Sequence, residues 1–230
     1  MHRDEMQETD LAGWLGDTGE RLMPDPMLAA LDDLYAIGPD PIATRRAQEK
    51  LRETLREAGH EVVYYDCLGD TPVGPLYVAV TERGLLAVQM EAEEQGFLAR
   101  LRRRTRADLV RSRARTAPVF RQLEGYFAGQ RRAFRLEADL EALSGFQRRV
   151  LETAQQVRYG QITTYGEIAK RIGRPRAARA VGQALARNPL PIVIPCHRVL
   201  AADGSLTGYS GAQGLQTKAF LLRMEGAIMY

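Results

Sequence analysis

Cysteine and long apolar runs are both scarce in this sequence. Only Cys67 and Cys196 occur among 230 residues, which is too few for a disulfide framework, and a reducing compartment would keep both as thiols. No apolar run approaches the roughly 18 residues that a membrane span needs. The N-terminus carries Asp4 and Glu5 with no apolar segment behind them, which argues against a secretory signal. We therefore expect a cytoplasmic protein that contacts no membrane.

Charge is divided unevenly along the chain. The formal net charge is +3, but residues 1–60 hold 7 Lys and Arg against 13 Asp and Glu, whereas residues 61–230 hold 25 against 16. One stretch of the basic part gathers Arg171, Arg174, Arg176, Arg179 and Arg187. Although an arginine-rich surface is often only solvated, this clustering predicts a polyanionic partner.

The length allows one large domain or two small ones, and periodicity favours a division into three segments. Residues 1–60 have helical spacing of apolar side chains at 27–36 and 43–58, which predicts an acidic helical extension. This segment contains no catalytic constellation. Ordinary packing is the favoured role, and an intramolecular cover, a partner-docking arm and a partly disordered tail are the alternatives.

Residues 61–138 have the pattern of a small domain with a sheet and flanking helices. Short segments rich in Val, Leu and Tyr are separated by turn residues, as in an antiparallel meander, and helical patterns follow them. The expected strands are residues 61–67, 74–80 and 84–90, and the expected helices are residues 91–104 and 117–130. The basic stretch 102–115 is expected to be a helix end and a surface loop.

The C-terminal part, residues 139–230, is predicted to be mostly helical. Ser144 begins a capping-box pattern for one helix, and Thr164 repeats the pattern for a second helix, which Gly173 ends. Pro175 suits the first turn of a third helix. Two helices joined by a tight turn that contains glycine predict a helix-turn-helix motif, which also occurs in proteins that never touch DNA.

The start of the third helix alternates arginine with small residues. Arg176 and Arg179 flank Ala177 and Ala178, so a backbone could come close to a groove while guanidinium groups reach phosphates or bases. A helix-packing face would explain the alanines, but it would explain the arginines less readily. The pattern therefore favours contact with a nucleic acid.

Cys196 stands in the string Pro195-Cys196-His197-Arg198. A thiol is a nucleophile only as thiolate, and a neighbouring imidazole and positive charge lower its pKa. The preceding run Ile192-Val193-Ile194 would also suit a buried structural cysteine. Because Pro195 ends that run and polar groups follow at once, the string favours a reactive thiol over a structural one.

Several strings occur in the order found in the O6-alkylguanine-DNA alkyltransferase family, and residues 146–226 resemble the C-terminal domain of that family. The matching strings are Tyr159-Gly160-Gln161-Ile162-Thr163-Thr164-Tyr165-Gly166-Glu167-Ile168-Ala169, Ala177-Ala178-Arg179-Ala180-Val181-Gly182, Asn188-Pro189, Ile194-Pro195-Cys196-His197-Arg198-Val199, Gly208-Tyr209-Ser210-Gly211 and Glu225-Gly226. Six ordered matches are far more specific than any one of them. Residues 61–135 resemble the family's smaller N-terminal domain, which is ribonuclease-H-like, without a diagnostic motif. Residues 1–60 match nothing in the family.

The resemblance implies DNA repair by transfer of an alkyl group from guanine O6, and less efficiently from thymine O4, to Cys196 in one irreversible turnover. In the family a histidine removes the thiol proton through a water and a glutamate orients that histidine, roles that fall on His197 and Glu225. Tyr165 would donate to guanine N3 as the base leaves, and Asn188 would order the neighbouring loop. No cofactor is needed. A surface acid at a helix end is the alternative for Glu225.

The resemblance also implies binding of double-stranded DNA through the minor groove, with the damaged nucleotide swung out of the stack. It assigns Arg179 to fill the vacated space. The other DNA-contacting residues would be Thr164, Tyr165, Arg176, Ala177 and Ala178, and the alkyl pocket would be lined by Pro191, Val199, Tyr209 and Ser210. We expect a monomer whose binding is salt-sensitive and weakly sequence-specific.

The expected fold is thus α/β, more closely α+β, with a small N-terminal domain that has an antiparallel sheet and flanking helices. A mostly helical, winged-helix-like domain follows it. Some relatives bind zinc in the N-terminal domain, but His2, His60 and Cys67 are the only ligands of that kind outside the motif, so no metal site is expected. A lesion-binding relative without the cysteine is disfavoured by Cys196. A cysteine hydrolase would need its histidine from His2 or His60.

Overall fold

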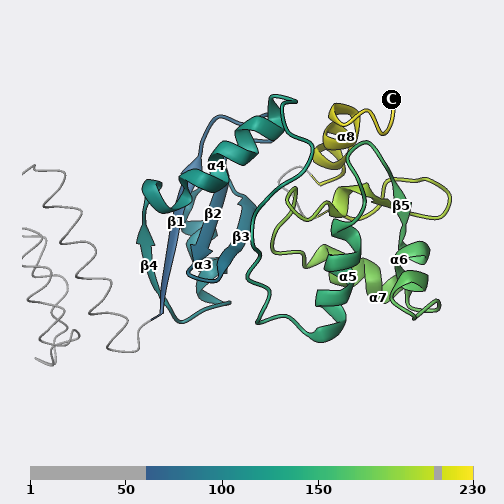
Figure 1. Ribbon diagram of the computed structural model, residues 1–230, viewed down its shortest axis with the longest axis horizontal. Coiled ribbons are helices and arrows are strands. Elements are labelled where there is room, and N and C mark those ends of the chain that lie inside the picture. The colour runs from purple at the N-terminus through teal and green to yellow at the C-terminus, as the bar shows by residue number, and fades with distance from the viewer. Residues whose placement is uncertain (1–60, 210–213, 230) are drawn as a thin grey trace, which may run out of the picture. The chain divides into compact units, whose positions relative to one another are not determined.

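The computed structural model of the protein describes residues 61–209 and 214–229 (Figure 1). The helices expected at residues 27–36 and 43–58 lie outside these residues. Residues 63–230 form one compact unit. The described chain consists of a sheet region, residues 61–140, and a helical region, residues 141–229.

The sheet region holds a four-stranded sheet in the order β3-β2-β1-β4. Its strands are β1 (Val62–Leu68), β2 (Leu76–Thr81), β3 (Gly84–Met90) and β4 (Asp108–Arg111). Strand β2 pairs antiparallel with both β1 and β3, so the predicted meander is confirmed. The predicted strand bounds differ from the observed ones by no more than the usual uncertainty at element ends.

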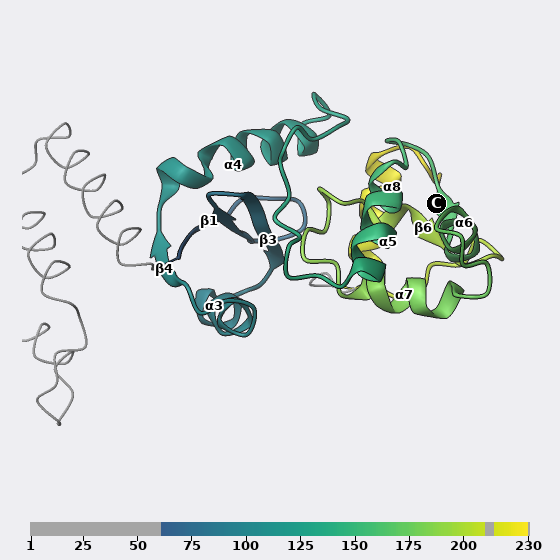
Figure 2. The same ribbon diagram turned by 60° about the horizontal axis from the view of Figure 1, so that its bottom comes forward.

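Two helices cover opposite faces of this sheet, α3 (Glu94–Arg102) and α4 (Arg113–Phe127), as Figure 2 shows. The alternation of side chains along a strand explains the arrangement. On β2, Tyr77 packs in a cluster with Phe97 of α3, whereas the neighbouring Val78 packs in the cluster that contains Phe120 of α4. Each face of the sheet therefore has its own helical cover.

The prediction for residues 102–115 was wrong in two respects, because β4 lies inside that stretch and α4 begins there at Arg113 rather than at residue 117. The four residues of β4, Asp108 to Arg111, are half-buried or exposed and line the edge next to β1. Arg111 donates to Asp66 at 2.9 Å across this edge. A strand so short and so charged has little periodic signal, and charged residues are typical of sheet edges.

The helical region contains four α-helices among the described residues. They are α5 (Gly145–Gln155), α6 (Tyr165–Arg171), α7 (Ala178–Ala186) and α8 (Leu215–Met224). The hydroxyl of Ser144 accepts from the Gln147 amide at 3.3 Å and that of Thr164 accepts from the Glu167 amide at 3.1 Å, so both predicted N-caps are present. None of the described helices is both long and apolar enough to cross a membrane.

The third predicted helix begins later than its sequence indicated. Gly173 ends the second helix with a φ of +73°, as expected from its glycine, but α7 starts at Ala178 rather than at Pro175. Arg176 therefore lies in the turn before α7 and not on the helix. The link between α6 and α7 is therefore longer than predicted, and the helix-turn-helix arrangement remains in place.

One apolar cluster contains residues of both regions, and three backbone hydrogen bonds tie β3 to the segments around Glu137 and Pro189. The amide of Leu85 donates to the Glu137 carbonyl at 2.8 Å, and the Asp139 amide donates back to Leu85 at 2.9 Å. A Cβ at Gly84 would lie 2.5 Å from the Glu137 oxygen, so this close approach requires glycine. Further along β3, Val88 donates to the carbonyl of Pro189 at 2.9 Å. Strand β3 thus braces the loop that leads to Cys196.

Candidate active site

Asn188 fixes the loop before Cys196 from inside. Its Nδ2 donates to the Ile194 carbonyl at 2.9 Å, and its Oδ1 accepts from the Leu190 amide at 3.0 Å. Between these anchors Ile192 has a φ of +72°, a conformation that a β-branched side chain rarely adopts and that typically costs about 1–3 kcal/mol. The Ile192 side chain is fully buried, so packing and the Asn188 clamp hold the strained backbone in place.

Cys196 begins a short 3₁₀ helix, η2 (Cys196–Arg198), and is only 6% exposed. Burial raises the pKa of its thiol, and the opposing effects of Asn188 and of the Lys218 ammonium are smaller. The sequence led us to expect neighbours that lower this pKa, but burial outweighs them. Cys196 therefore rests as a neutral thiol, and its reaction requires a base.

His197 has one ring nitrogen engaged and one available. Its Nε2 lies 3.0 Å from Oε1 of Glu225, whereas its buried Nδ1 has no hydrogen-bond partner within residues 61–209 and 214–229. Burial lowers the pKa of this fully buried imidazole, so the neutral form is favoured. Because a carboxylate can only accept, Nε2 carries the hydrogen and Nδ1 carries the lone pair.

Glu225 lies at the centre of a buried network rather than at the surface. Arg198 donates to both of its carboxylate oxygens, from Nε to Oε2 and from Nη2 to Oε1, each at 2.8 Å. The Tyr126 hydroxyl donates to Oε1 at 2.6 Å. Burial alone would raise the pKa of this carboxyl, but the hydrogen bonds from His197, Arg198 and Tyr126 lower it to about 2. The carboxylate is therefore ionised at neutral pH.

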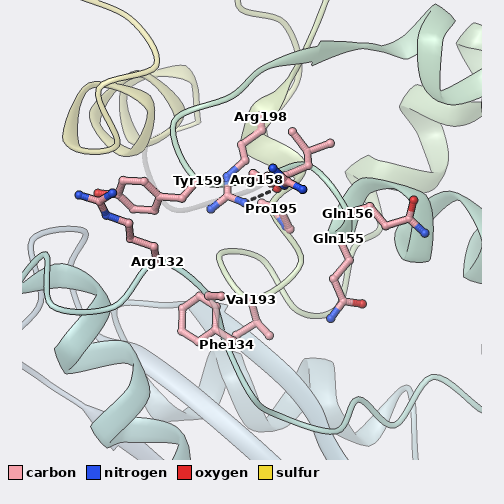
Figure 3. Close-up of a pocket in the computed structure, with 11 residues that line it drawn as sticks. Arg132, Phe134, Gln155, Gln156, Arg158, Tyr159, Val193, Pro195 and Arg198 are labelled. Carbon is pink, nitrogen blue, oxygen red and sulfur yellow. Dashed lines mark hydrogen bonds between the residues drawn. The ribbon is translucent and has the colours of Figure 1, made fainter.

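Arg198 is also tied to the end of α5 and borders a hollow. Its Nη1 donates to the Val157 carbonyl at 2.5 Å, which is the dashed line in Figure 3. The hollow has a volume of about 500 Å³, and Arg132, Arg158 and Arg198 line it without any carboxylate. Arg198 thus contacts Glu225 and also lines this hollow.

Two residues of this site gave no signal in the sequence. Lys218 of α8 is fully buried, where its Nζ donates to the carbonyls of Val199 at 2.7 Å and Thr207 at 2.9 Å, and burial lowers its pKa to about 8. A lysine on an amphipathic helix is normally interpreted as solvated, and Tyr126 lies in a stretch that was predicted only as a helix. Arg198 was noticed, but only as a positive neighbour of the thiol.

Tyr165 and the 199–209 segment come together beside α8. The Tyr165 hydroxyl donates to the Thr207 carbonyl at 3.1 Å, the same oxygen that Lys218 contacts. Val199 is buried in β6 (Val199–Leu200), which pairs parallel with β5 (Thr163–Thr164), so Val199 lies opposite Thr163. The Tyr209 hydroxyl is buried and has no hydrogen-bond partner in the described part of the chain.

The structure gives less support to the other two residues predicted for the alkyl pocket. Pro191 is buried and lines a different hollow of about 330 Å³, together with Asn188 and Arg187. Ser210 lies outside the described residues. Their assignment to an alkyl pocket remains a prediction.

Four of the predicted DNA-binding residues lie in α7 and the turn before it. Arg179 near the start of α7 and Arg176 in the preceding turn are both exposed, and Ala177 and Ala178 between them are half-buried. Gly182, one turn further on, would bring a Cβ to 3.8 Å from the Tyr165 ring. The small residues thus serve in part to pack α7 against α6, while the arginines point to solvent.

Two family models match this chain. Residues 63–140 match the ribonuclease-like domain of 6-O-methylguanine DNA methyltransferase, and residues 145–227 match its DNA binding domain. Curated relatives include the methylated-DNA–protein-cysteine methyltransferase of Methanosarcina acetivorans, 40% identical over 167 residues that cover 71% of this chain and 99% of the relative. The protein of the same name from Mycobacterium leprae is 39% identical over 156 residues, covering 68% and 88%.

Solved structures give the same result. A crystal structure of Mycobacterium tuberculosis OGT in complex with DNA is similar at 36% identity with a TM-score of 0.61, covering 71% of this chain and 93% of that chain. The O6-methylguanine-DNA methyltransferase of Pyrococcus kodakaraensis is similar at 29% identity with a TM-score of 0.52, covering 71% and 99%. Both matches leave part of this chain uncovered.

Proposed function

Because this chain belongs to the 6-O-methylguanine DNA methyltransferase family, we propose that it repairs DNA by moving an alkyl group from guanine O6 to Sγ of Cys196. The observation that carries the proposal is the buried chain of contacts behind the thiol. His197 follows Cys196 directly, its Nε2 is held by Glu225, and its Nδ1 is left with a lone pair. A resting neutral thiol beside a neutral imidazole is the pair that nucleophilic attack by cysteine requires.

The chemical step needs one proton transfer and one displacement. His197 takes the thiol proton through a water, and Glu225 stabilises the imidazolium that forms. The thiolate then attacks the alkyl carbon, so that an S–C bond forms and the C–O6 bond breaks, and the electron pair leaves with guanine. Tyr165 donates to guanine N3 and stabilises the charge that develops on the leaving base.

Tyr165 must change partner for this role. Its hydroxyl donates to the Thr207 carbonyl in the described structure, and that carbonyl also accepts from Lys218. When Tyr165 turns to guanine, Lys218 still satisfies the Thr207 oxygen, so no buried acceptor is left without a donor. The change of hydrogen-bond partner by Tyr165 therefore costs the loop little free energy.

DNA is bound, in this proposal, through the minor groove by α7 and the turn before it. Arg179 fills the space of the flipped nucleotide, and Thr164, Arg176, Ala177 and Ala178 lie against the backbone. A repair protein need not read sequence, so specificity is weak and binding is salt-sensitive. The protein acts as a monomer and also accepts O4-alkylthymine, less efficiently.

Turnover is single because the product is a thioether. Methylated Cys196 has no proton to lose and is no longer a nucleophile. The protein is consumed as it repairs. In this proposal Val199 and Tyr209 line the alkyl pocket.

The decisive experiment is the mass of the Cys196 peptide after incubation with duplex DNA that contains O6-methylguanine. One added methyl mass, equal in amount to the guanine restored, is expected. Cys196→Ser should abolish transfer and leave lesion binding largely unchanged, whereas the matched variant Cys67→Ser should transfer at the wild-type rate. Restored guanine with an unmodified Cys196 peptide would refute the proposal.

A further inference from the structure

Tyr126 joins the sheet region to the centre of the active site. It lies in α4, is fully buried, and its hydroxyl donates to Oε1 of Glu225 at 2.6 Å across 99 residues of sequence. Its ring packs against three other aromatic rings, with centroids 5.4 Å from Phe127, 5.3 Å from Phe134 and 6.1 Å from Tyr159. The ring is thus held by packing, and the hydroxyl is the only part of it that reaches a charged group.

Oε1 of Glu225 is shared by three donors, and each has a different effect. Arg198 neutralises the charge through two parallel bonds, and His197 is the group that the carboxylate orients. Tyr126 contributes a short hydrogen bond without adding charge. It therefore fixes the position of Oε1 and stabilises the carboxylate without adding a charge of its own.

The direction of the Tyr126 hydrogen bond is not ambiguous. Burial raises the pKa of the Tyr126 phenol and the Glu225 charge raises it further, so the phenol stays protonated and donates. Because Glu225 is ionised, Oε1 can only accept from it. The carboxylate can then accept from His197 only if the hydrogen of the imidazole is on Nε2.

We propose that Tyr126 is a positioning residue for alkyl transfer, whose hydroxyl holds Glu225 Oε1 in place and thereby keeps His197 in the tautomer with its lone pair on Nδ1. This inference rests on the proposed function, since it assigns Nδ1 the role of base. It makes the chemistry of the helical region depend on one hydroxyl of the sheet region.

The pH dependence of transfer is the readout that separates positioning from packing. The charged and titratable groups that act on the pKa of His197 are Glu225, which raises it, and Arg198 and Lys218, which lower it, while burial lowers it most. The thiol of Cys196 is its direct neighbour. Replacing Tyr126 by Phe changes none of these groups, but it leaves Oε1 with one donor fewer, so the carboxylate holds the imidazolium more tightly.

The test compares wild type with Tyr126→Phe in methyl transfer at saturating duplex DNA from pH 5 to 9, with DNA affinity and thermal midpoint measured in parallel. We expect transfer to slow by about tenfold or more, the acid limb of the profile to move to higher pH, and the Kd for DNA to stay the same. The ¹⁵N shifts of His197 should show a less uniform tautomer.

The matched control is Tyr65→Phe. Tyr65 also donates its hydroxyl to a glutamate, Glu94, at 2.8 Å, and it is also buried, but it lies on β1 outside the site. This variant is expected to lose some stability and to keep the wild-type rate and pH profile. Equal behaviour of both variants in rate and profile would overturn the proposal and assign Tyr126 to packing alone.

A second substitution decides the matter if Tyr126→Phe does not fold. Fluorotyrosine at position 126 keeps the ring and the hydroxyl but makes the hydroxyl a stronger donor, so the acid limb should move to lower pH. An unmoved limb would overturn the proposal. If wild type itself leaves Cys196 unmethylated, the proposed function fails first, which distinguishes the two failures.

Discussion

At the scale of single residues, Glu225 shows how a buried charge is made tolerable. An isolated carboxylate in an apolar interior would take up a proton, and burial does push its pKa in that direction. The guanidinium of Arg198 and the donors of His197 and Tyr126 reverse this effect, and the pKa falls to about 2. A buried ion pair of this kind adds little to the stability of the folded protein, but removal of one partner lowers that stability strongly.

The stability of the protein should therefore depend on the ionisation of Glu225. A carboxyl whose pKa is depressed to about 2 stabilises the fold above its ordinary pKa and loses that effect as the pH falls toward 2. In urea unfolding, the stability difference between wild type and Glu225→Gln should shrink by about 2 kcal/mol from pH 6 to pH 3. An unchanged difference would mean that Glu225 is not ionised in the folded protein.

The site residues divide into those with and without a signal in the sequence. Cys196 and His197 could be singled out because they are adjacent and follow a proline-terminated apolar run. Tyr126 and Lys218 could not, because their roles come from contacts across 99 residues and from burial of a helix face that the sequence does not specify. Glu225 was assigned only through its family resemblance, and its alternative as a surface acid is excluded by its burial.

At the scale of elements, the local signals that worked are those with a geometric cause. Ser144 and Thr164 cap their helices because their hydroxyls satisfy the amides three residues on, and Gly173 ends a helix because it accepts a positive φ. Pro175 was a weaker signal, since a proline suits a turn as well as a first helical turn, and α7 begins at Ala178. Strand β4 is too short for periodicity to reveal it.

Arg176 in the turn before α7 and Arg179 in α7 supply a matched pair for testing the proposed extrusion of the damaged nucleotide. Arg179→Ala should slow transfer more on duplex than on single-stranded substrate, because only the duplex has a stack to be filled. Arg176→Ala removes the same type of side chain a few positions earlier in the chain. It should lower the rate on both substrates by the same factor, as the loss of a phosphate contact does. If Arg179→Ala shows equal losses too, Arg179 is a phosphate contact as well.

At the scale of the whole molecule, the uneven distribution of charge is the property that the fold leaves unexplained. Residues 1–60 carry a net charge of about −6 and the remainder about +9. Both family matches lie within residues 63–227, so the acidic segment has no counterpart in them. A negative segment on the chain of a DNA-binding protein competes with the phosphates for the same arginines.

Deletion of residues 1–60 should therefore strengthen binding to duplex DNA at low salt. The gain should vanish near 1 M salt, where the screening length falls to roughly 3 Å. Titration of both forms against one duplex at several salt concentrations measures the effect. Unchanged affinity at low salt would dismiss the segment as an electrostatic regulator.

The hydrogen bonds along β3 also affect how exposed the edge of the sheet is. An exposed strand edge is a template on which a second chain can pair and start aggregation. Here the segment around Glu137 to Asp139 and the carbonyl of Pro189 already occupy hydrogen-bonding positions along β3. At the opposite edge β4 is short and ends at Arg111. The contacts that brace the loop leading to Cys196 thus also occupy part of the β3 edge, and this disfavours pairing of that edge with another copy of the protein.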